Sequence, residues 1–254
     1  MKRLALICGL IFAAAAAACA AKYVEREFTC PVCGDSFYAK LDTGEVPHDM
    51  RLDLKPLGDA PAPWLLPDCP VCGFVVYSIS MTKAELAKSK TIVFSEEYIK
   101  NQKRSSYFRL GLLYDKLGKP PFMVANAFLR ASWQEEKEPA RLKEDLELTL
   151  KFFSACAKDE KSVVEERENS QLLMGELLRR LGKFEEASAH MKGLQKIKGF
   201  QNNFFGDVVA YQLNLCAQKD ASVYEMEDVR SSKKPLLDQL RWQFKKLMRK
   251  YKKQ

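Results

Sequence analysis

The same five residues, Cys-Pro-Val-Cys-Gly, occur twice in this chain, at residues 30–34 and 69–73. Two thiolates three positions apart on a tight turn can bind one metal ion. Pro after the first Cys fixes φ, and Gly after the second Cys permits the left-handed turn that directs backbone N–H groups toward the sulfurs. Two such turns supply the closed tetrahedral ligand set of a structural Zn²⁺ site. The sequence therefore predicts one structural Zn²⁺ bound by Cys30, Cys33, Cys69 and Cys72.

The spacing leaves two other uses of these cysteines open, namely two local disulfides and a redox dithiol. The segment between the turns is longer than a compact zinc ribbon needs, although an inserted hairpin would leave both turns free to meet. A redox pair needs one exposed Cys at a helix N-terminus, where its pKa is lowered. Pro31 and Pro70 stand where the thioredoxin motif usually has another residue, and no helix signal follows Gly34. The pattern thus favours a metal site.

The N-terminus has the features of an export signal. Lys2 and Arg3 precede an apolar run over residues 4–18, which is short of the ~20 residues that a membrane span needs. We therefore predict a signal peptide at residues 1–21 and an exported protein. Cys19 follows a run of Ala, and the last three of these with Cys19 resemble a bacterial lipobox. A soluble periplasmic protein and a lipoprotein anchored through Cys19 both remain open.

The remainder divides into a β-rich segment and a helical segment. Residues 22–81 are predicted to form a zinc-knuckle domain with strands near 23–29, 36–41 and 50–54. From residue 82 the pattern is helical, beginning with the capping box Thr82-x-x-Glu85. The expected fold is mainly α, with a small β-rich Cys₄ zinc-ribbon-like domain before a tetratricopeptide-like helical array at residues 82–229. Helices are expected over residues 107–118, 122–136, 139–158, 163–181, 184–198 and 204–219.

Two helix pairs carry the spacing of tetratricopeptide repeats. Gly175, Gly182 and Ala187 match that signature together, and residues 110–125 resemble it with two extra residues at the turn. A plain helical bundle is the alternative. In the repeat register, one set of side chains lies on the inner face, which commonly binds a protein or peptide unless the chain's own N-terminal domain fills it. The predicted partner-binding residues are Phe108, Leu112, Asn169, Leu172, Glu176 and Arg179.

The positive charge of the chain is concentrated at its C-terminus. Of the 41 Lys and Arg residues, ten lie in residues 230–254 beside a single acidic residue, Asp238. This segment is predicted to be a basic amphipathic helix with the apolar stripe Leu236, Leu240, Phe244 and Leu247. We expect the stripe to cap the helical array by packing on residues 204–219. Peripheral contact with an anionic membrane is compatible with capping, and nucleic acid is disfavoured because the chain is predicted to be exported.

These motifs together resemble a family of bacterial proteins of unknown function. Its members carry a CPxCG turn near the N-terminus, a second CPxCGF-type turn and tetratricopeptide-like helices, matched here by residues 30–34, 69–74 and roughly 108–194. The resemblance implies that the four cysteines are the family's metal turns, and it implies no activity. The export signal and the basic tail depart from the family pattern.

The sequence offers little for catalysis. It contains none of the motifs HExxH, GxGxxG, P-loop or GxSxG, and only two His, His48 and His190. Four Cys ligands leave no open position for a metal-bound water. The predicted function is a non-enzymatic interaction scaffold of the bacterial envelope that holds a protein or peptide partner. The alternative is an envelope thiol–disulfide oxidoreductase that uses the CxxC motifs.

Overall fold

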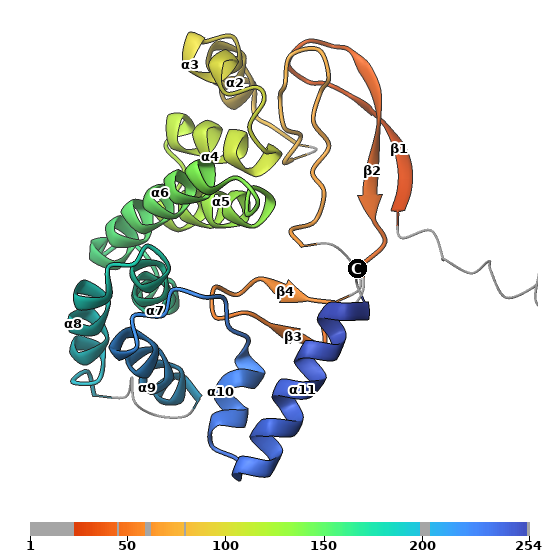
Figure 1. The fold of residues 1–254 in the computed structure, drawn as a ribbon. Coiled ribbons are helices and arrows are strands. Elements are labelled where there is room, and N and C mark those ends of the chain that lie inside the picture. The colour runs from red at the N-terminus through yellow and green to blue at the C-terminus, as the bar shows by residue number, and fades with distance from the viewer. Residues whose placement is uncertain (1–22, 45, 59–61, 79, 199–203, 253–254) are drawn as a thin grey trace, which may run out of the picture.

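The computed structural model describes residues 23–44, 46–58, 62–78, 80–198 and 204–252 of the chain. The predicted signal peptide and Cys19 lie outside the described residues. The described part is mainly helical, as expected, with a small amount of strand near its N-terminal end (Figure 1).

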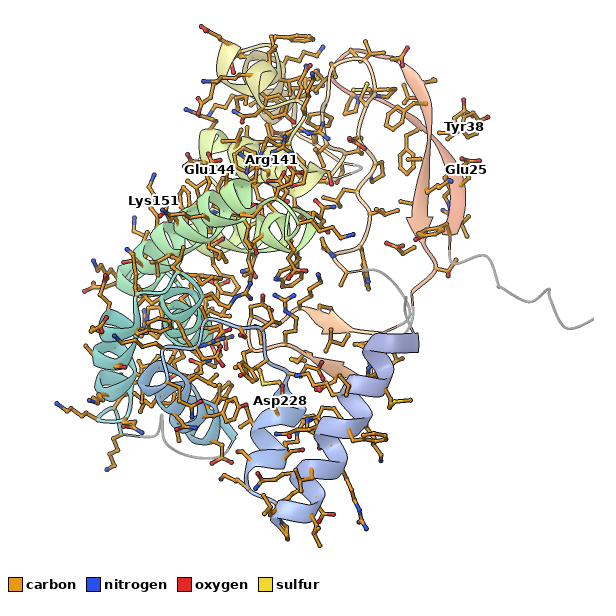
Figure 2. All side chains as sticks on the ribbon, in the orientation of Figure 1. Glu25, Tyr38, Arg141, Glu144, Lys151 and Asp228 are labelled. Atoms are coloured by element: carbon orange, nitrogen blue, oxygen red, sulfur yellow. The ribbon has the colours of Figure 1, made fainter. Side chains whose placement is uncertain are left out.

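The first cysteine turn connects the two strands of a β-hairpin. Strands β1 (Tyr23–Thr29) and β2 (Ser36–Asp42) pair antiparallel from Tyr23 opposite Asp42 to Thr29 opposite Ser36, which confirms both predicted strands. Phe28 and Phe37 stack with ring centroids 5.9 Å apart. Tyr38 is exposed and points away from the helices (Figure 2). The hairpin thus packs Phe28 and Phe37 beside the cysteines, while the rest of β1 is exposed.

The helices begin and end where local signals place them. Ser95 accepts a hydrogen bond from the backbone N–H of Tyr98 at the start of α3, and Gly118 ends α4 with φ of +71°. The predicted helices are confirmed to within a few residues. The helices are α2 (Lys83–Val93), α3 (Glu96–Lys100), α4 (Ser106–Leu117), α5 (Pro121–Gln134), α6 (Pro139–Lys158), α7 (Val164–Arg180), α8 (Phe184–Leu194), α9 (Phe204–Ala217), α10 (Met226–Ser232) and α11 (Leu236–Lys252).

Helices α4 to α9 stack in chain order along a curved path (Figure 1). Two helix pairs approach closely at a glycine. A Cβ on Gly111 of α4 would lie 2.7 Å from the Phe128 ring of α5, and a Cβ on Gly175 of α7 would lie 2.2 Å from Cε of Met191 in α8. A single long helix, α6, lies between these pairs, whereas an unbroken array of two-helix repeats would place an even number there. The tetratricopeptide assignment remains a prediction.

A second, short hairpin lies on the concave side of this array (Figure 1). Strands β3 (Asp49–Met50) and β4 (Pro56–Leu57) pair antiparallel between the two cysteine turns, so the inserted segment does contain a hairpin. The strand expected at residues 50–54 is wrong beyond Met50. The chain turns there instead, with φ of +64° at Leu54 and a hydrogen bond of 2.9 Å from Leu54 N to Arg51 O.

The C-terminal helix α11 packs beside α10, a short helix that the sequence did not predict. The four residues expected to cap α9, namely Leu236, Leu240, Phe244 and Leu247, are exposed. The expectation of inward capping by this stripe is therefore wrong. The reason is that α11 makes its contacts to α10 through polar side chains on its opposite face, notably Trp242 and Lys246.

Candidate metal centre

The four predicted cysteines lie together, and their sulfur atoms are all within 4.8 Å of one another. Two close separations cross between the turns, at 3.6 Å from Cys30 Sγ to Cys72 Sγ and 3.5 Å from Cys33 Sγ to Cys69 Sγ. Cys30, Cys69 and Cys72 are buried and Cys33 is exposed. Two turns that are far apart in the sequence thus form one compact cluster of thiols, as predicted.

The spacing of the sulfurs suits a tetrahedral metal better than disulfides. A disulfide requires about 2.05 Å between sulfurs, and all four cysteines are free. Zn–S bonds of about 2.3 Å in a tetrahedron place the sulfurs about 3.8 Å apart, close to the separations of 3.5 and 3.6 Å. A tetrahedral set of four soft thiolates is typical of Zn²⁺ or iron. The residues present therefore fit a structural metal ion.

The two turns share one backbone conformation, which the identical sequence explains. The N–H of Gly34 donates to Cys30 O, and the N–H of Gly73 donates to Cys69 O, both at 2.8 Å. Gly34 and Gly73 have φ values of +82° and +74°, in the left-handed region that side chains other than Gly rarely adopt. The glycines are thus needed for the turn itself.

Burial and backbone hydrogen bonds act in opposite directions on the thiols. Burial raises the pKa of Cys30 and Cys72, while hydrogen bonds from the N–H groups of Cys33 and Phe74, respectively, lower it in part. At Cys33, burial also raises the pKa, but the N–H of Asp35 and the neighbouring thiols outweigh this effect and lower it. Four thiolates at these distances repel one another strongly. A bound cation removes that repulsion, which is why metal binding and thiol deprotonation are coupled.

The second turn is held by side chains from the helices. Tyr98 Oη donates to Gly73 O at 3.0 Å, and Arg109 Nη1 donates to the same oxygen at 2.6 Å. Arg109 Nη2 also pairs with Asp68 Oδ2 at 2.5 Å. The buried cysteines share one apolar core with Val93, Tyr98 and Leu113. This core therefore continues across residue 82 into α2, α3 and α4.

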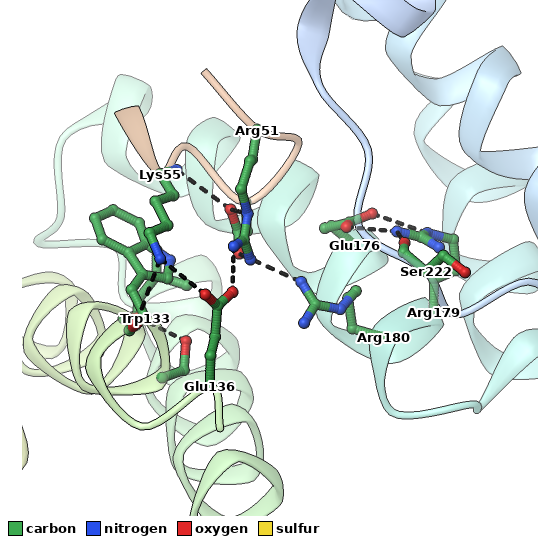
Figure 3. A network of polar contacts seen from close by, with 11 residues as sticks. Arg51, Lys55, Trp133, Glu136, Glu176, Arg179, Arg180 and Ser222 are labelled. Atoms are coloured by element: carbon green, nitrogen blue, oxygen red, sulfur yellow. Dashed lines mark hydrogen bonds and ion pairs between the residues drawn. The ribbon is translucent and has the colours of Figure 1, made fainter. Parts of the chain in front are cut away.

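The residues predicted to line a partner groove are mostly buried against the chain itself. Phe108 lies under the Arg104 guanidinium, 3.5 Å from the ring centroid, and packs edge-on against Phe128. Glu176 and Arg179 form a bidentate pair at 2.6 and 2.9 Å. Arg179 also donates to the carbonyl oxygens of Asp220 and Ser222, as Figure 3 shows in part. The side chains of Phe108, Glu176 and Arg179 are thus occupied by contacts within the chain.

Of the three remaining members of the predicted set, one is buried and two are partly accessible. Leu172 is buried with Leu52, which comes from the inserted hairpin. Leu112 and Asn169 are only partly buried, and Asn169 lines a cavity beside His48. The expectation of an open groove along the whole inner face is thus corrected, because the chain's own segments occupy much of it.

A charged network that the sequence did not suggest fixes the inserted hairpin to the helices (Figure 3). Arg51 pairs with Asp53 at 2.5 Å and with Glu136, which lies in the connection between α5 and α6. Lys55 pairs with Glu136 at 2.8 Å, and Arg180 Nη1 lies 3.4 Å from Asp53 Oδ2. The only local signal is the alternation of charges at residues 51, 53 and 55, which also suits a solvent-exposed loop.

A second charged cluster joins the α3–α4 connection to α5 and α6. Arg104 donates to Glu135 Oε2 at 2.9 Å and to Asp145 Oδ1 at 2.8 Å. Burial, together with the Glu135 carboxylate, raises the pKa of Asp145 to about 8 despite the nearby guanidinium. Asp145 is fully buried, so a substrate cannot reach it without rearrangement. We interpret these ion pairs as contacts that stabilise the packing of the helices.

Comparison of the chain with protein-family models, with curated proteins and with solved structures gives no match. The resemblance to bacterial proteins with paired CPxCG turns therefore stays a prediction.

Proposed function

We propose that this protein is a non-enzymatic scaffold in which one structural Zn²⁺, held by Cys30, Cys33, Cys69 and Cys72, joins the N-terminal hairpin to the helical array. The observation that carries the proposal is the cluster of four sulfurs within 4.8 Å, contributed equally by two turns. Four thiolates complete a tetrahedral coordination sphere and leave no position for a reacting ligand. In this role the metal stabilises the arrangement of two segments and takes no part in a reaction.

The arrangement favours this role over thiol–disulfide exchange. Cys30 lies 3.6 Å from Cys72 and Cys33 lies 3.5 Å from Cys69, so each cysteine of one CxxC motif has a close neighbour in the other motif. Strand β2, and not a helix, follows the first turn. A redox CxxC depends on a helix N-terminus to lower the pKa of its exposed Cys.

We further propose that the array is tetratricopeptide-like, that the cysteine domain is zinc-ribbon-like, and that the protein works in the bacterial envelope with a protein or peptide partner. The close helix contacts at Gly111 and Gly175 support the first assignment. The apolar run at residues 4–18 supports export, with a soluble or lipid-anchored form. Among the described residues, no helix is both long and apolar enough to cross a bilayer. The partner is expected at surfaces outside the filled part of the concave face.

Metal analysis of the purified protein tests the proposal. We expect one Zn²⁺ per chain by elemental analysis, and colourless protein distinguishes zinc from iron. Cys72→Ser should abolish stoichiometric metal, while the matched variant Cys216→Ser, at a buried cysteine outside the cluster, should retain it. Metal-free protein of full stability, with reversible disulfides at Cys30–Cys33 or Cys69–Cys72, would instead support the oxidoreductase.

A further inference from the structure

Among the described side chains of helix α11, those that contact the rest of the protein lie on one side of the helix. Trp242 Nε1 donates to Asp228 Oδ1 at 2.8 Å, and Lys246 Nζ pairs with Asp228 Oδ2 at 2.5 Å. Lys246 also lies 5.6 Å from the ring centroid of Tyr224. Asp228 projects from α10 toward α11 in Figure 2. These contacts place the Trp242 and Lys246 face of the helix against the rest of the molecule.

The pattern of exposure along α11 agrees with these contacts. The partly buried positions of α11 are Asp238, Gln239, Trp242 and Lys246. Their spacings of three and four residues place them on one side of the helix. At about 100° per residue, the large apolar residues fall on the opposite side. They form a stripe that is 44–72% exposed, called here the α11 stripe: Leu236, Leu237, Leu240, Phe244, Leu247 and Met248.

The α11 stripe is accompanied by strong positive charge. The helix contains six Lys or Arg residues and one Asp. Arg241 and Lys245 are both exposed and lie along one edge of the stripe on the helix surface. A helix with a basic polar side and a side of Leu, Phe and Met is suited to lie in the interface of an anionic bilayer. Each basic residue near such a surface strengthens binding roughly fivefold.

We propose that α11 docks on the surface of an anionic lipid bilayer, lying along the interface with the α11 stripe inserted at the boundary of headgroups and acyl chains. The structure supports this occupant because the polar side of α11 is already used for contacts to α10, while the apolar side faces outward. Pairing of two copies through their stripes would bring the basic residues of both helices together, where they repel one another. Binding of nucleic acid through its phosphates would leave the apolar stripe exposed to solvent. The proposal does not depend on the metal centre.

Vesicle co-sedimentation of the full chain tests this docking. Wild type should bind vesicles of equimolar phosphatidylglycerol and phosphatidylcholine at least about tenfold more tightly than pure phosphatidylcholine vesicles, and added salt should weaken binding. The double variant Leu240→Ser/Phe244→Ser should lose at least about tenfold in affinity for the anionic vesicles. The matched control is Phe94→Ser/Ile99→Ser, which should bind as wild type does. These residues have similar exposure and lie at the end of α2 and in α3, two helices at the other end of the molecule from α11 (Figure 1).

Every variant keeps the apolar run at residues 4–18, which can also bind vesicles. Hydrogen exchange on the same samples separates the two contributions, because it is measured over α11 itself. Anionic vesicles should slow amide exchange over residues 236–248 in wild type. Unchanged exchange there, or unchanged binding by the stripe variant, overturns the proposal. A dimer in solution that the stripe variant converts to monomer would identify a second copy as the occupant. Tight binding of duplex DNA that survives in the stripe variant would show a nucleic-acid role and also overturn it.

Discussion

The two cysteine turns have identical sequences and the same backbone conformation, yet their surroundings differ. Val32 of the first turn is 5% exposed, whereas Val71 at the same position of the second turn is 65% exposed. The cysteines show the reverse order, since Cys33 is exposed and its counterpart Cys72 is buried. Local sequence therefore determines the shape of each turn, and the segments packed around the turn determine which of its side chains are buried.

The two turns also differ in the contacts that hold them in place. The second turn receives hydrogen bonds from Tyr98 of α3 and Arg109 of α4. The first turn belongs to the β1–β2 hairpin, and its link to the second turn includes the cysteine cluster and its apolar core. We therefore expect the metal to matter most for the hairpin and the helices to matter most for the second turn.

Removal of the proposed metal should produce the largest effect, and this effect should be unequal between the turns. Loss of the shared ion leaves close thiols without a cation and should cost at least about 3 kcal/mol of unfolding free energy. Hydrogen exchange should accelerate strongly over residues 23–42 and less over residues 69–77, while α5 to α8 stay protected. Chelation followed by re-addition of Zn²⁺ provides the control, since protection should return. Equal acceleration at both turns would contradict the proposed division of support.

Replacement of Arg109 should weaken the second turn specifically. Arg109→Met removes the hydrogen bond to Gly73 O and leaves Asp68 without its guanidinium partner. Because Arg109 is buried but Asp68 is about half exposed, we expect a loss of about 2–4 kcal/mol in chemical denaturation.

The matched control for Arg109→Met is Arg141→Met. Arg141 forms an exposed ion pair with Glu138, so its loss should change stability by about 0.5 kcal/mol or less. A similar loss in both variants would show that the contacts of Arg109 to the second turn contribute little.

The two valines give a direct comparison within the repeated sequence. Val32→Ala removes buried methyl groups from the core of the cluster and should cost about 1–2.5 kcal/mol. Val71→Ala changes an exposed side chain and should be neutral within about 0.5 kcal/mol. The melting temperatures of the two metal-loaded variants measure the difference. Equal effects would mean that Val32 is not packed as described.

The smallest expected effect concerns a single hydroxyl group. Tyr98→Phe keeps the buried ring but removes the donor to Gly73 O, which still accepts from Arg109. We expect a loss of about 0.5–1.5 kcal/mol with unchanged metal content. A double-mutant cycle with Arg109→Met should show coupling, because both side chains bond to one oxygen. Strict additivity would indicate that the two donors support the turn independently.

The sequence by itself determined the features that depend on neighbours along the chain. The spacing of Cys, Pro and Gly predicted both turns and the four thiols that meet. Ser95 and Gly118 marked a helix start and a helix end because capping and left-handed backbone are local effects. Helical periodicity located α4 to α9 because an apolar stripe repeats every 3.6 residues. The amphipathic character of α11 was also evident.

Tertiary structure decided which faces and charges became buried. Glu136 lies 85 residues from Arg51, and Asp53 lies 127 residues from Arg180, so the charged insertion looked like a solvated loop until its partners were known. Glu176 and Arg179 were similarly expected at a groove and are buried as a pair. In α11, Asp228 binds Trp242 and Lys246 and thereby turns the apolar stripe outward. Burial of a charged or amphipathic segment depends on the partner that compensates its desolvation, and that partner is specified only by the fold.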